Sequence, residues 1–443
     1  MARIKVVFLL LALVGSALWL LADTLLPQPL TYFSFRSVFV QFSGWLAMVA
    51  MSLAMLLALR PKWLERPLDG LDKMYRLHKW LGISALVLGL LHWWWAKGTK
   101  WMVGWGWLVK PPRSGAAPEY TGLEAWLRTQ RGLAETLGEW TFYIALVLLV
   151  LALVKAFPYR LFRKTHKLLA LVYLVLVYHT LVLFKFAYWS QPLGWVMVAL
   201  LLVGSVAAVL VLTGRVGRNR KVAGTICSLQ THPGVQVVEG GIALQPGWPG
   251  HQPGQFAFVT SSRSEGAHPY TIASAWNPQQ QQLRFVIKAL GDWTGQLQDY
   301  LHEGLPVQVE GPYGCFDFND QQPRQIWIGA GIGITPFIAK MQHRASQPSP
   351  QTIDLFHVTA ERDDGALDKL RADAAAAGVN LHIRLSREEG RLTAEQIRAA
   401  VPEWQQASIW FCGPAEFGQA LQQDFRRHGL ARGRFHQELF NMR

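Results

Sequence analysis

The sequence predicts a multi-domain protein: an all-α bundle of six transmembrane helices, then a small β-barrel, then a parallel, Rossmann-like α/β domain. Two observations lead to this prediction. The 443 residues are 51% apolar and include 20 Trp, a composition typical of a membrane protein that also carries soluble parts. After the last long apolar stretch, short β-rich runs give way to alternating strand and helix patterns.

Six stretches are long and apolar enough to cross a bilayer, which takes about 20 helical residues. They lie at about 4–22, 37–59, 76–95, 139–157, 166–184 and 193–213. Lys and Arg gather in alternate connections, so the positive-inside rule predicts a multi-pass protein of the cell inner (plasma) membrane with both termini in the cytoplasm. The alternative, a cleaved secretory signal in place of the first crossing, would break this alternation of charge.

The positive charge belongs to the membrane half of the chain. Up to Thr213 there are 21 Lys and Arg against 8 Asp and Glu, and after it 22 against 21. A nucleic-acid partner would require a basic soluble face, so we expect none. The cysteines (Cys227, Cys315 and Cys412) form no C-x-x-C pair. Disulfide frameworks and iron–sulfur clusters are therefore not expected.

Four histidines fall in two of the predicted crossings: His78 and His92 in the third, His166 and His179 in the fifth. At about 1.5 Å per residue, the members of each pair are about 20 Å apart, nearly the depth of the apolar slab. Both crossings run outward, so the four imidazoles can form an inner and an outer facing pair. A lone membrane histidine is usually a packed residue bonded to a neighbouring helix, but four at matched depths favour metal ligation.

Two facing imidazoles suit a metal coordinated along one axis, such as a haem iron, whereas zinc requires four ligands in a tetrahedron. Because both axial positions are filled, electron transfer is the expected task of two b-type haems. One feature is irregular. A 14-residue interval returns to within about 40° of the same helix face, but a 13-residue interval ends about 140° away. The fifth crossing must therefore be locally distorted, or present its haems differently.

The soluble half is predicted to follow a membrane domain at 1–213 and a linker at 214–221. Residues 222–318 contain β-rich runs broken by Pro and Gly, typical of a small barrel. Residues 319–443 alternate strands and helices, typical of a parallel sheet. The turn "GAGIGITPF" (329–337) follows a strand and opens a helix. Such a turn lets backbone amides approach a pyrophosphate, although a tight glycine turn without a ligand would look similar.

Together these features resemble the ferric reductase and NADPH oxidase superfamily, in which a six-helix bis-haem membrane domain is joined to a ferredoxin-reductase-like dehydrogenase module. The resemblance covers nearly the whole chain. It rests on the histidine spacing and on "HPYTIAS" (268–274), "KALGDWT" (288–294), "EGPYG" (310–314), "GAGIGITPF" (329–337) and "FCGP" (411–414). It implies that the barrel binds FAD and that the α/β domain binds NAD(P)H.

The resemblance implies a set of flavin-binding residues. Tyr270 would pack on the isoalloxazine, while Thr271 or Ser274 would bond the ring edge or the phosphate–ribose groups. "KALGDWT" would hold the pyrophosphate, and Phe440 would shield the flavin. His268 stands where soluble ferredoxin reductases have Arg, and the loss of that permanent cation implies weaker, dissociable FAD binding. The full FAD set is His268, Pro269, Tyr270, Thr271, Ser274, Lys288, Gly291, Asp292, Trp293, Thr294 and Phe440.

The resemblance also implies the NAD(P)H-binding residues. Thr335 and Pro336 would lie near the nicotinamide, and Cys412 would stand beside it during hydride transfer, unless it is only a buried strand-end cysteine. Arg362 would meet the 2′-phosphate of NADPH, while the acidic residues around it would hold a ribose hydroxyl of NADH, the alternative coenzyme. The set is Gly329, Gly331, Gly333, Thr335, Pro336, Arg362, Cys412, Gly413 and Pro414.

The expected activity follows from the cofactors that the resemblance implies. NAD(P)H gives up two electrons as a hydride and a haem iron takes one, so FAD stands between them. We expect an enzyme that passes electrons from cytoplasmic NAD(P)H through FAD and two b-type haems to an outside acceptor, namely O2, yielding superoxide. Alternatives are a ferric-chelate reductase, whose anionic substrate Lys97, Lys100, Lys110 and Arg113 would attract, and an electron donor to a periplasmic protein. A non-enzymatic haem protein is disfavoured by the nucleotide motifs.

Overall fold

The computed structural model describes residues 2–112, 119–154 and 156–438. These residues fall into two compact units. Among these described residues, the membrane unit comprises 2–64 and 73–216, and the soluble unit comprises 65–72 and 217–438.

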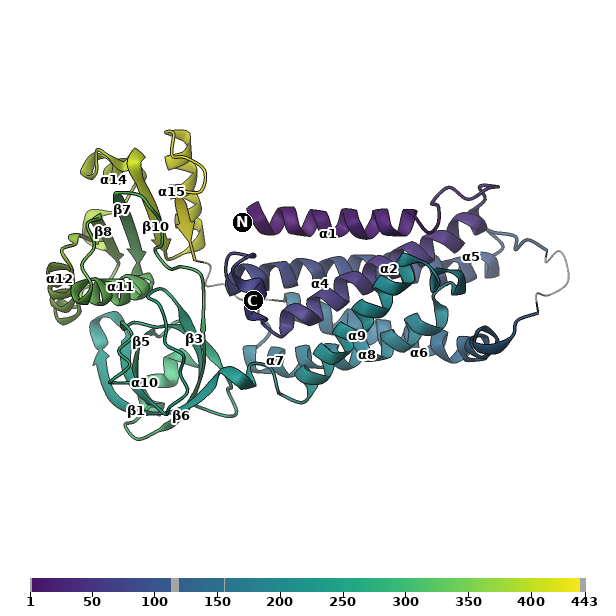
Figure 1. Cartoon of the computed structure of the whole chain (residues 1–443), viewed down its shortest axis with the longest axis horizontal. Helices are drawn as coiled ribbons and strands as arrows, with labels where there is room; N and C mark the ends of the chain where they lie inside the picture. Colours follow the sequence, from purple (N-terminus) through teal and green to yellow (C-terminus); the bar gives the residue numbers. More distant parts are fainter. Residues whose placement is uncertain (1, 113–118, 155, 439–443) are drawn as a thin grey trace. The chain divides into compact units, whose positions relative to one another are not determined.

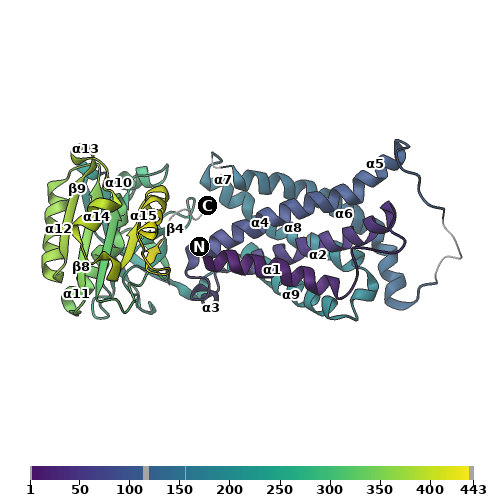
Figure 2. The ribbon, with the colours of Figure 1, turned by 90° about the horizontal axis from the view of Figure 1, so that it is seen from above.

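Long helices lying side by side make up the membrane unit (Figures 1 and 2). They form because their apolar runs are interrupted only near their ends, where caps stop them: α2 begins at a capping box made by Thr31 and Ser34, and Pro192 opens α9, where its missing N–H costs little. The helices are α1 (Ala2–Leu20), α2 (Tyr32–Ala58), α3 (Lys62–Glu65), α4 (Leu71–Trp93), α5 (Thr99–Gly104), α6 (Gly122–Leu153), α7 (Tyr159–Lys167), α8 (Leu169–Leu183) and α9 (Pro192–Leu212).

Among the described residues, five helical segments are long and apolar enough to cross a membrane: Arg3–Leu20, Tyr32–Ala58, Gly122–Leu153, Tyr159–Leu183 and Pro192–Leu212. The protein is therefore a multi-pass membrane protein. The predicted crossing at 76–95 is a helix of 23 residues, α4, but its charged first turns and its two histidines lower its apolar character. The predicted count of six crossings is thus not confirmed by length and composition.

The predicted distortion of the fifth crossing is confirmed. The helix is interrupted at Leu168, between His166 in α7 and His179 in α8. The N–H of Leu168 donates to the carbonyl of Thr165 at 3.0 Å, and the N–H of Leu171 donates to the carbonyl of Leu168 at 3.0 Å. These three-residue turns rotate about 120° per residue instead of about 100°. The tightening brings His179 closer to the face that carries His166.

Helix packing in the membrane unit places α6 against α8 and α2 against α9. Its core contains large buried side chains, among them Trp19, Trp45, Tyr173 and Met197. The hydroxyl of Tyr173 lies 2.8 Å from that of Ser52, so this buried polar group is satisfied by a neighbouring helix.

The soluble unit begins with an antiparallel sheet in the order β4-β3-β6-β1-β2-β5. The strands are β1 (Lys221–His232), β2 (Val237–Leu244), β3 (Phe256–Thr260), β4 (His268–Thr271), β5 (Gln282–Lys288) and β6 (Pro306–Tyr313). One antiparallel bridge, between Ile272 and Phe285, links the two ends of the sheet. A closed barrel would need a longer ladder there, so the predicted barrel is not confirmed.

The second sheet is parallel, in the order β11-β10-β7-β8-β9. Its strands are β7 (Arg324–Ala330), β8 (Thr352–Thr359), β9 (Asn380–Leu385), β10 (Ala407–Cys412) and β11 (Phe435–Gln437). The predicted α/β module is confirmed.

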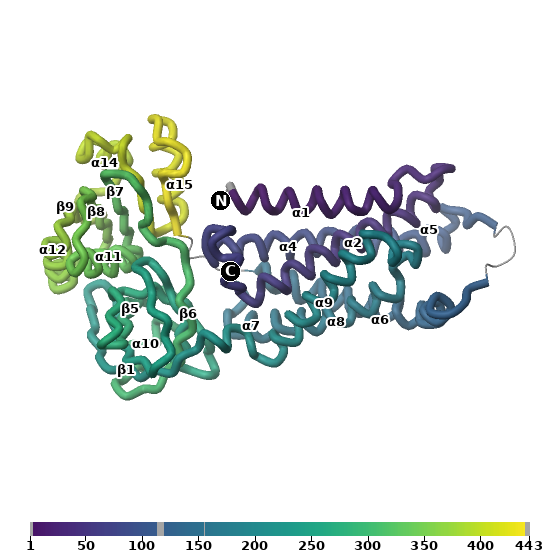
Figure 3. The backbone as a smooth tube through the Cα atoms, viewed as in Figure 1, coloured from purple at the N-terminus to yellow at the C-terminus, as the bar shows by residue number. Residues whose placement is uncertain are grey.

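Helices cover both faces of this parallel sheet because alternate strand residues point to opposite sides. Ile326 and Ile328 pack with α14 (Ala394–Ala400) and α15 (Ala415–Arg427). Trp327 packs on the other face, in the cluster that includes residues of α11 (Thr335–Ser346) and α12 (Asp364–Ala377). Figure 3 follows the backbone through these strands and helices.

Candidate functional site

The structure brings the four predicted membrane histidines together as two facing pairs. His78 and His92 lie on α4, His166 on α7 and His179 on α8. The ring centroids are 5.9 Å apart for His78 and His166, with planes at 62°, and 6.3 Å apart for His92 and His179, with planes at 77°. Two metal–imidazole bonds of about 2 Å each would separate the ring centroids by about 6 Å. Both spacings fit one metal ion between the rings.

Main-chain carbonyls hold three of the four imidazoles by their Nδ1 atoms. The pairs are His78 with Ala54 at 2.9 Å, His92 with Val40 at 3.0 Å, and His179 with Ala134 at 2.8 Å. A carbonyl can only accept, so Nδ1 carries the proton and the Nε2 lone pair is left for a metal. Metal-bound histidines typically make this second contact.

His166 differs from the other three. Its Nδ1 is buried and has no hydrogen-bond partner among the described residues. Its ring stacks instead on Phe162, one helical turn earlier, with centroids 4.9 Å apart and planes at 27°. The inner pair therefore has one imidazole that is oriented by a carbonyl and one that is oriented by an aromatic ring.

The donor set fits a haem iron better than other metals. No group of three or more His, Cys, Asp or Glu side chains that could hold a metal occurs within the described part of the chain, whereas structural zinc requires four ligands. What is present is two nitrogen donors facing each other between apolar helices, which is the axial arrangement of a six-coordinate haem.

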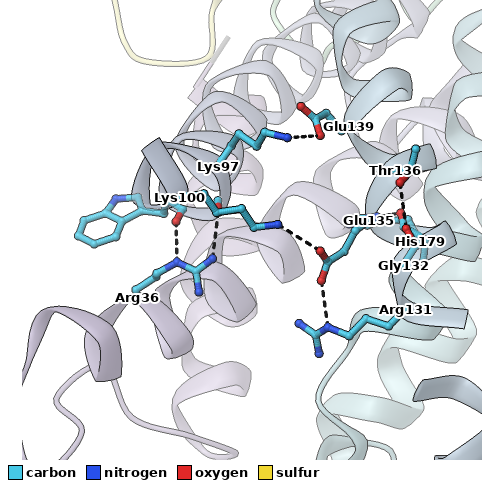
Figure 4. A network of polar contacts seen from close by, with 12 residues as sticks. Arg36, Lys97, Lys100, Arg131, Gly132, Glu135, Thr136, Glu139 and His179 are labelled. Carbon is cyan, nitrogen blue, oxygen red and sulfur yellow. Dashed lines mark hydrogen bonds and ion pairs between the residues drawn. The ribbon is translucent and has the colours of Figure 1, made fainter. Parts of the chain in front are cut away.

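A polar network joins α6 to residues 97–100 of the membrane unit (Figure 4). Lys97 donates to Glu139 at 2.6 Å. Lys100 and Arg131 both contact Glu135, at 3.3 Å and 2.9 Å. Two of the lysines expected to attract an anionic chelate are therefore ion-paired. Arg113, from the same prediction, lies outside the described residues.

A π-helical turn, η1 (Trp94–Gly98), follows directly after His92 and its neighbour in α4. Arg36 on α2 donates to two carbonyls of this turn, those of Trp95 at 2.9 Å and Ala96 at 3.0 Å. A π-turn leaves helical carbonyls unpaired, and such turns are frequent at functional sites. No sequence pattern indicates this turn, because backbone hydrogen bonding depends on the packed partner.

The two predicted flavin motifs, 268–274 and 288–294, are in contact in the soluble unit. His268 on β4 stacks with Tyr270, with centroids 6.4 Å apart and planes at 19°, and with Trp293, at 6.0 Å and 24°. Residues two apart on a strand share one face. Pro269, between them, is paired with Phe258 of β3, and Thr271 is 9% exposed.

Several predicted flavin ligands already bond within the protein. The Ser274 hydroxyl accepts the N–H of Arg284 at 3.1 Å. The Thr294 hydroxyl accepts the N–H groups of Leu290 and Gly291, each at 3.0 Å. Asp292 in the same turn is exposed. In this structure, therefore, the Gly291 amide supports the turn itself.

Lys288 is a predicted ligand of the flavin pyrophosphate, but the structure pairs it with Glu361. The Nζ atom of Lys288 lies 2.7 Å from Oε2 of Glu361. The hydrogen bond from Lys288 is the main reason that the pKa of Glu361 lies below its usual value. Because Lys288 and Glu361 are 73 positions apart, no local pattern in the sequence indicates this pair. Arg362 is exposed and paired instead with Asp364 at 2.8 Å.

The glycine turn lies where the ends of β7 and β10 meet. Gly331 has a left-handed φ of +57°, a conformation that costs glycine nothing. A Cβ built on Gly333 would overlap the carbonyl of Cys412, so only glycine permits this close approach. Thr335 is 2% exposed and donates its hydroxyl to the carbonyl of Ile332 at 2.7 Å. Pro336 occupies the first turn of α11, and Gly329 is in β7.

Cys412 ends β10 and is fully buried. Burial chiefly, and then the nearby Glu438 carboxylate, raise the pKa of the Cys412 thiol well above its usual value. The thiol is therefore neutral at physiological pH. Gly413 and Pro414 lead into α15. Glu438 is 4% exposed and is not singled out by any sequence motif, and Phe440 lies outside the described residues.

Comparison with known proteins identifies two family matches. Residues 43–177 match the ferric reductase like transmembrane component, and residues 244–317 match an FAD-binding domain. A superoxide-generating NADPH oxidase heavy chain of Dictyostelium discoideum is 25% identical over 340 residues, covering 67% of this chain and 62% of that protein. The respiratory burst oxidase homolog protein E of Arabidopsis thaliana is 31% identical over 207 residues, covering 40% of this chain and 21% of that protein.

A third relative, the ferric reduction oxidase 5 of Arabidopsis thaliana, is 35% identical over 107 residues, covering 23% of this chain and 15% of that protein. The chain thus spans less than two thirds of the length of each of these relatives.

Proposed function

We propose, because the chain matches a ferric reductase like transmembrane component and an FAD-binding domain, that it passes electrons from cytoplasmic NAD(P)H through FAD and two b-type haems to O2 outside the cell. The product is superoxide. The matched families and the named relatives support a transmembrane FAD- and NAD(P)H-dependent oxidoreductase.

The observation that carries the proposal is the geometry of the two histidine pairs. Each pair has the ring spacing that one axially coordinated iron requires. In three of the four rings a backbone carbonyl fixes the tautomer that leaves Nε2 free to bind iron. Bound haem would supply one-electron chemistry, and with one histidine from each of two helices holding the iron these residues would serve electron transfer rather than oxygen binding.

Membrane orientation supports the outward direction of transfer. Lys and Arg are abundant at 60–79 and 158–167 and absent from 23–34, so the positive-inside rule places the first two segments and both termini in the cytoplasm. At the opposite end, Trp101, Trp105 and Trp107 are exposed, as in the aromatic belt at a membrane interface. The membrane is the cell inner (plasma) membrane.

The soluble unit would supply the electrons. The glycine turn after β7 offers backbone amides to a pyrophosphate, and the neutral Cys412 thiol next to it adds no charge near a nicotinamide. The preference for NADPH rests on Arg362. Its acidic neighbour Glu361 is engaged by Lys288, which leaves Asp364 as the carboxylate that a 2′-phosphate would have to displace.

O2 is favoured over a ferric chelate because the lysines expected to attract the chelate form ion pairs. Lys97 and Lys100 are paired with Glu139 and Glu135, which weakens the field that would recruit an anionic chelate. Ferric-chelate reduction remains the second candidate because the chain is similar to the ferric reduction oxidase 5. Electron donation to a periplasmic protein is the third.

The test is anaerobic reduction of the purified, FAD-supplemented protein with limiting NADPH, followed optically at the haem bands. Rapid reoxidation by air with superoxide detected supports the oxidase. Haems that remain reduced in air and are oxidised only by a ferric chelate indicate a ferric reductase. Haems that NADPH never reduces would exclude the proposed electron path.

A further inference from the structure

Each outer imidazole lies against a glycine one helical turn after the carbonyl that holds it. On α6 the carbonyl of Ala134 accepts the Nδ1–H of His179 at 2.8 Å. Gly138, four residues later, faces the same ring. A Cβ built on Gly138 would overlap the Nδ1 and Cε1 atoms of His179. Any side chain there would push the ring away from the carbonyl.

The same arrangement recurs on α2 for the other member of the outer pair. The carbonyl of Val40 accepts the Nδ1–H of His92 at 3.0 Å. A Cβ built on Gly44, again four residues later, would lie 3.1 Å from Cε1 and 3.2 Å from Nδ1 of that ring. Positions four apart share one helix face. In both helices, the accepting carbonyl and the glycine four residues later therefore lie on the same side and form one cradle for the imidazole.

We propose that Gly138 and Gly44 are positioning residues for the outer histidine pair. A helix without a side chain at this point lets the imidazole approach the backbone closely enough to donate its Nδ1 proton to the carbonyl one turn before. This inference rests on the proposed function, in which His92 and His179 bind a haem. At the inner pair the sequence differs, because Ala58 follows four residues after Ala54.

The cradle should affect the haem in two measurable ways. A hydrogen bond from the second nitrogen of a metal-bound imidazole fixes the orientation of the ring. The loss of such a bond typically lowers metal affinity about 10- to 100-fold. They also raise the basicity of the ligand, which favours ferric iron. Displacing His179 from the Ala134 carbonyl should therefore weaken haem binding at the outer pair and shift its reduction potential upward.

The experiment compares Gly138→Ala with Gly132→Ala in the full-length purified protein. Gly132 is on the same helix, and a Cβ there meets nothing within 4 Å, so it is a matched control. The readouts are haem retained per chain, an optical redox titration and electron paramagnetic resonance. Gly138→Ala should lose haem about 10- to 100-fold more readily, raise one of the two haem potentials and show a new high-spin ferric signal. Gly132→Ala should behave as wild type.

If Gly138→Ala does not accumulate in the cell, Gly44→Ala tests whether the glycines position the outer histidines. Its contacts are less severe, so the shift should be smaller and of the same sign. Potentials and spectra that match those of Gly132→Ala, even with a lower melting temperature, would mean that the glycines only pack and would overturn the proposal. A His179→Leu variant with unchanged haem content would instead overturn the ligand assignment itself, so the two failures are distinguishable.

Discussion

The inner and outer histidine pairs differ in what holds their rings. In the outer pair both Nδ1 atoms donate to carbonyls, those of Val40 and Ala134. In the inner pair His78 donates to the Ala54 carbonyl, while His166 stacks on Phe162 just before the helix is interrupted at Leu168. Similar histidine spacing along the chain thus leads to two different surroundings.

This difference has a physical consequence. A hydrogen bond to a fixed carbonyl restricts both the tilt and the tautomer of an imidazole, whereas an aromatic stack restricts only its plane. The outer pair is therefore the more rigid of the two. The inner pair, next to the interrupted helix, is the one where ring movement costs less.

The largest effect is expected when a histidine of either pair is replaced. Electron transfer should then stop at a different cofactor, depending on which pair loses its histidine. In His92→Leu, NADPH should still reduce FAD and the inner haem, while transfer to the outside falls to background because the outer haem is lost. In His78→Leu, flavin reduction should persist but neither haem should be reduced. Stopped-flow absorbance under anaerobic conditions distinguishes these cases. Reduction of the same haem bands in both variants would contradict the division into an inner and an outer pair.

Phe162→Ala tests the weaker support of the inner pair. The change removes the ring that stacks on His166, whose Nδ1 has no hydrogen-bond partner among the described residues. We expect the inner haem affinity to fall about 10-fold, with the outer titration step unchanged. Haem retention during dilution measures this. Leu161→Ala, an exposed neighbour on the same helix, is the control, and an equal loss in both variants would count against the stack.

The connection after α1 and the connection before α9 should also share an acid-sensitive contact. Asp23 accepts hydrogen bonds from Tyr188 and from Lys185, the latter at 2.7 Å. Burial would raise the pKa of Asp23, but these bonds outweigh it and hold the pKa below its usual value. The stabilisation is therefore complete above the unfolded pKa and is lost as pH falls through the folded one.

Asp23→Asn should lower stability by about 1 kcal/mol near pH 7, and the difference should shrink as acid protonates the carboxyl. Thermal unfolding of the wild type and the variant at decreasing pH provides the measurement. A difference in stability that does not depend on pH would show that the carboxylate charge is not responsible.

The smallest expected effect concerns the pair between Lys97 and Glu139, whose side chains are 31% and 28% exposed. Partly exposed ion pairs contribute little, so a double-mutant cycle with Lys97→Met and Glu139→Gln should give a coupling of about 0.5 kcal/mol. Salt should reduce it. The exposed pair between Arg128 and Glu124 on α6 is the comparison. If the coupling between Lys97 and Glu139 is no larger than that between Arg128 and Glu124, the pair does not support the outer end.

The ligand pairs can be predicted from sequence, but their surroundings cannot. Histidine is rare in membrane helices, so the two intervals are informative. The 13-residue interval predicts either a distortion, as found at Leu168, or a different presentation of the haems. Every residue carries a carbonyl, however, so the choice of Val40, Ala54 and Ala134 depends on how the helices pack. The position of Gly138 beside His179 cannot be predicted either, because glycine is frequent in membrane helices.

In the soluble unit, too, the sequence predicts the elements but not the contacts between side chains. The elements from β7 to α15 lie close to their predicted positions, because buried parallel strands and amphipathic helices leave clear periodic patterns. The contacts that engage Lys288 and Thr294 are not predictable in this way, since a lysine or a threonine in a turn has many possible partners. The parts that stay predictions, above all the flavin and nucleotide ligands, are those whose partner is another molecule.

The most direct test counts the haems and assigns them to the pairs. The purified wild-type chain should carry about two haems, both low-spin with two axial histidines, and His78→Leu and His179→Leu should each carry about one, with different potentials. A wild-type chain with at most one haem, or variants that keep the full haem content, would contradict the assignment of the two facing histidine pairs as the electron path.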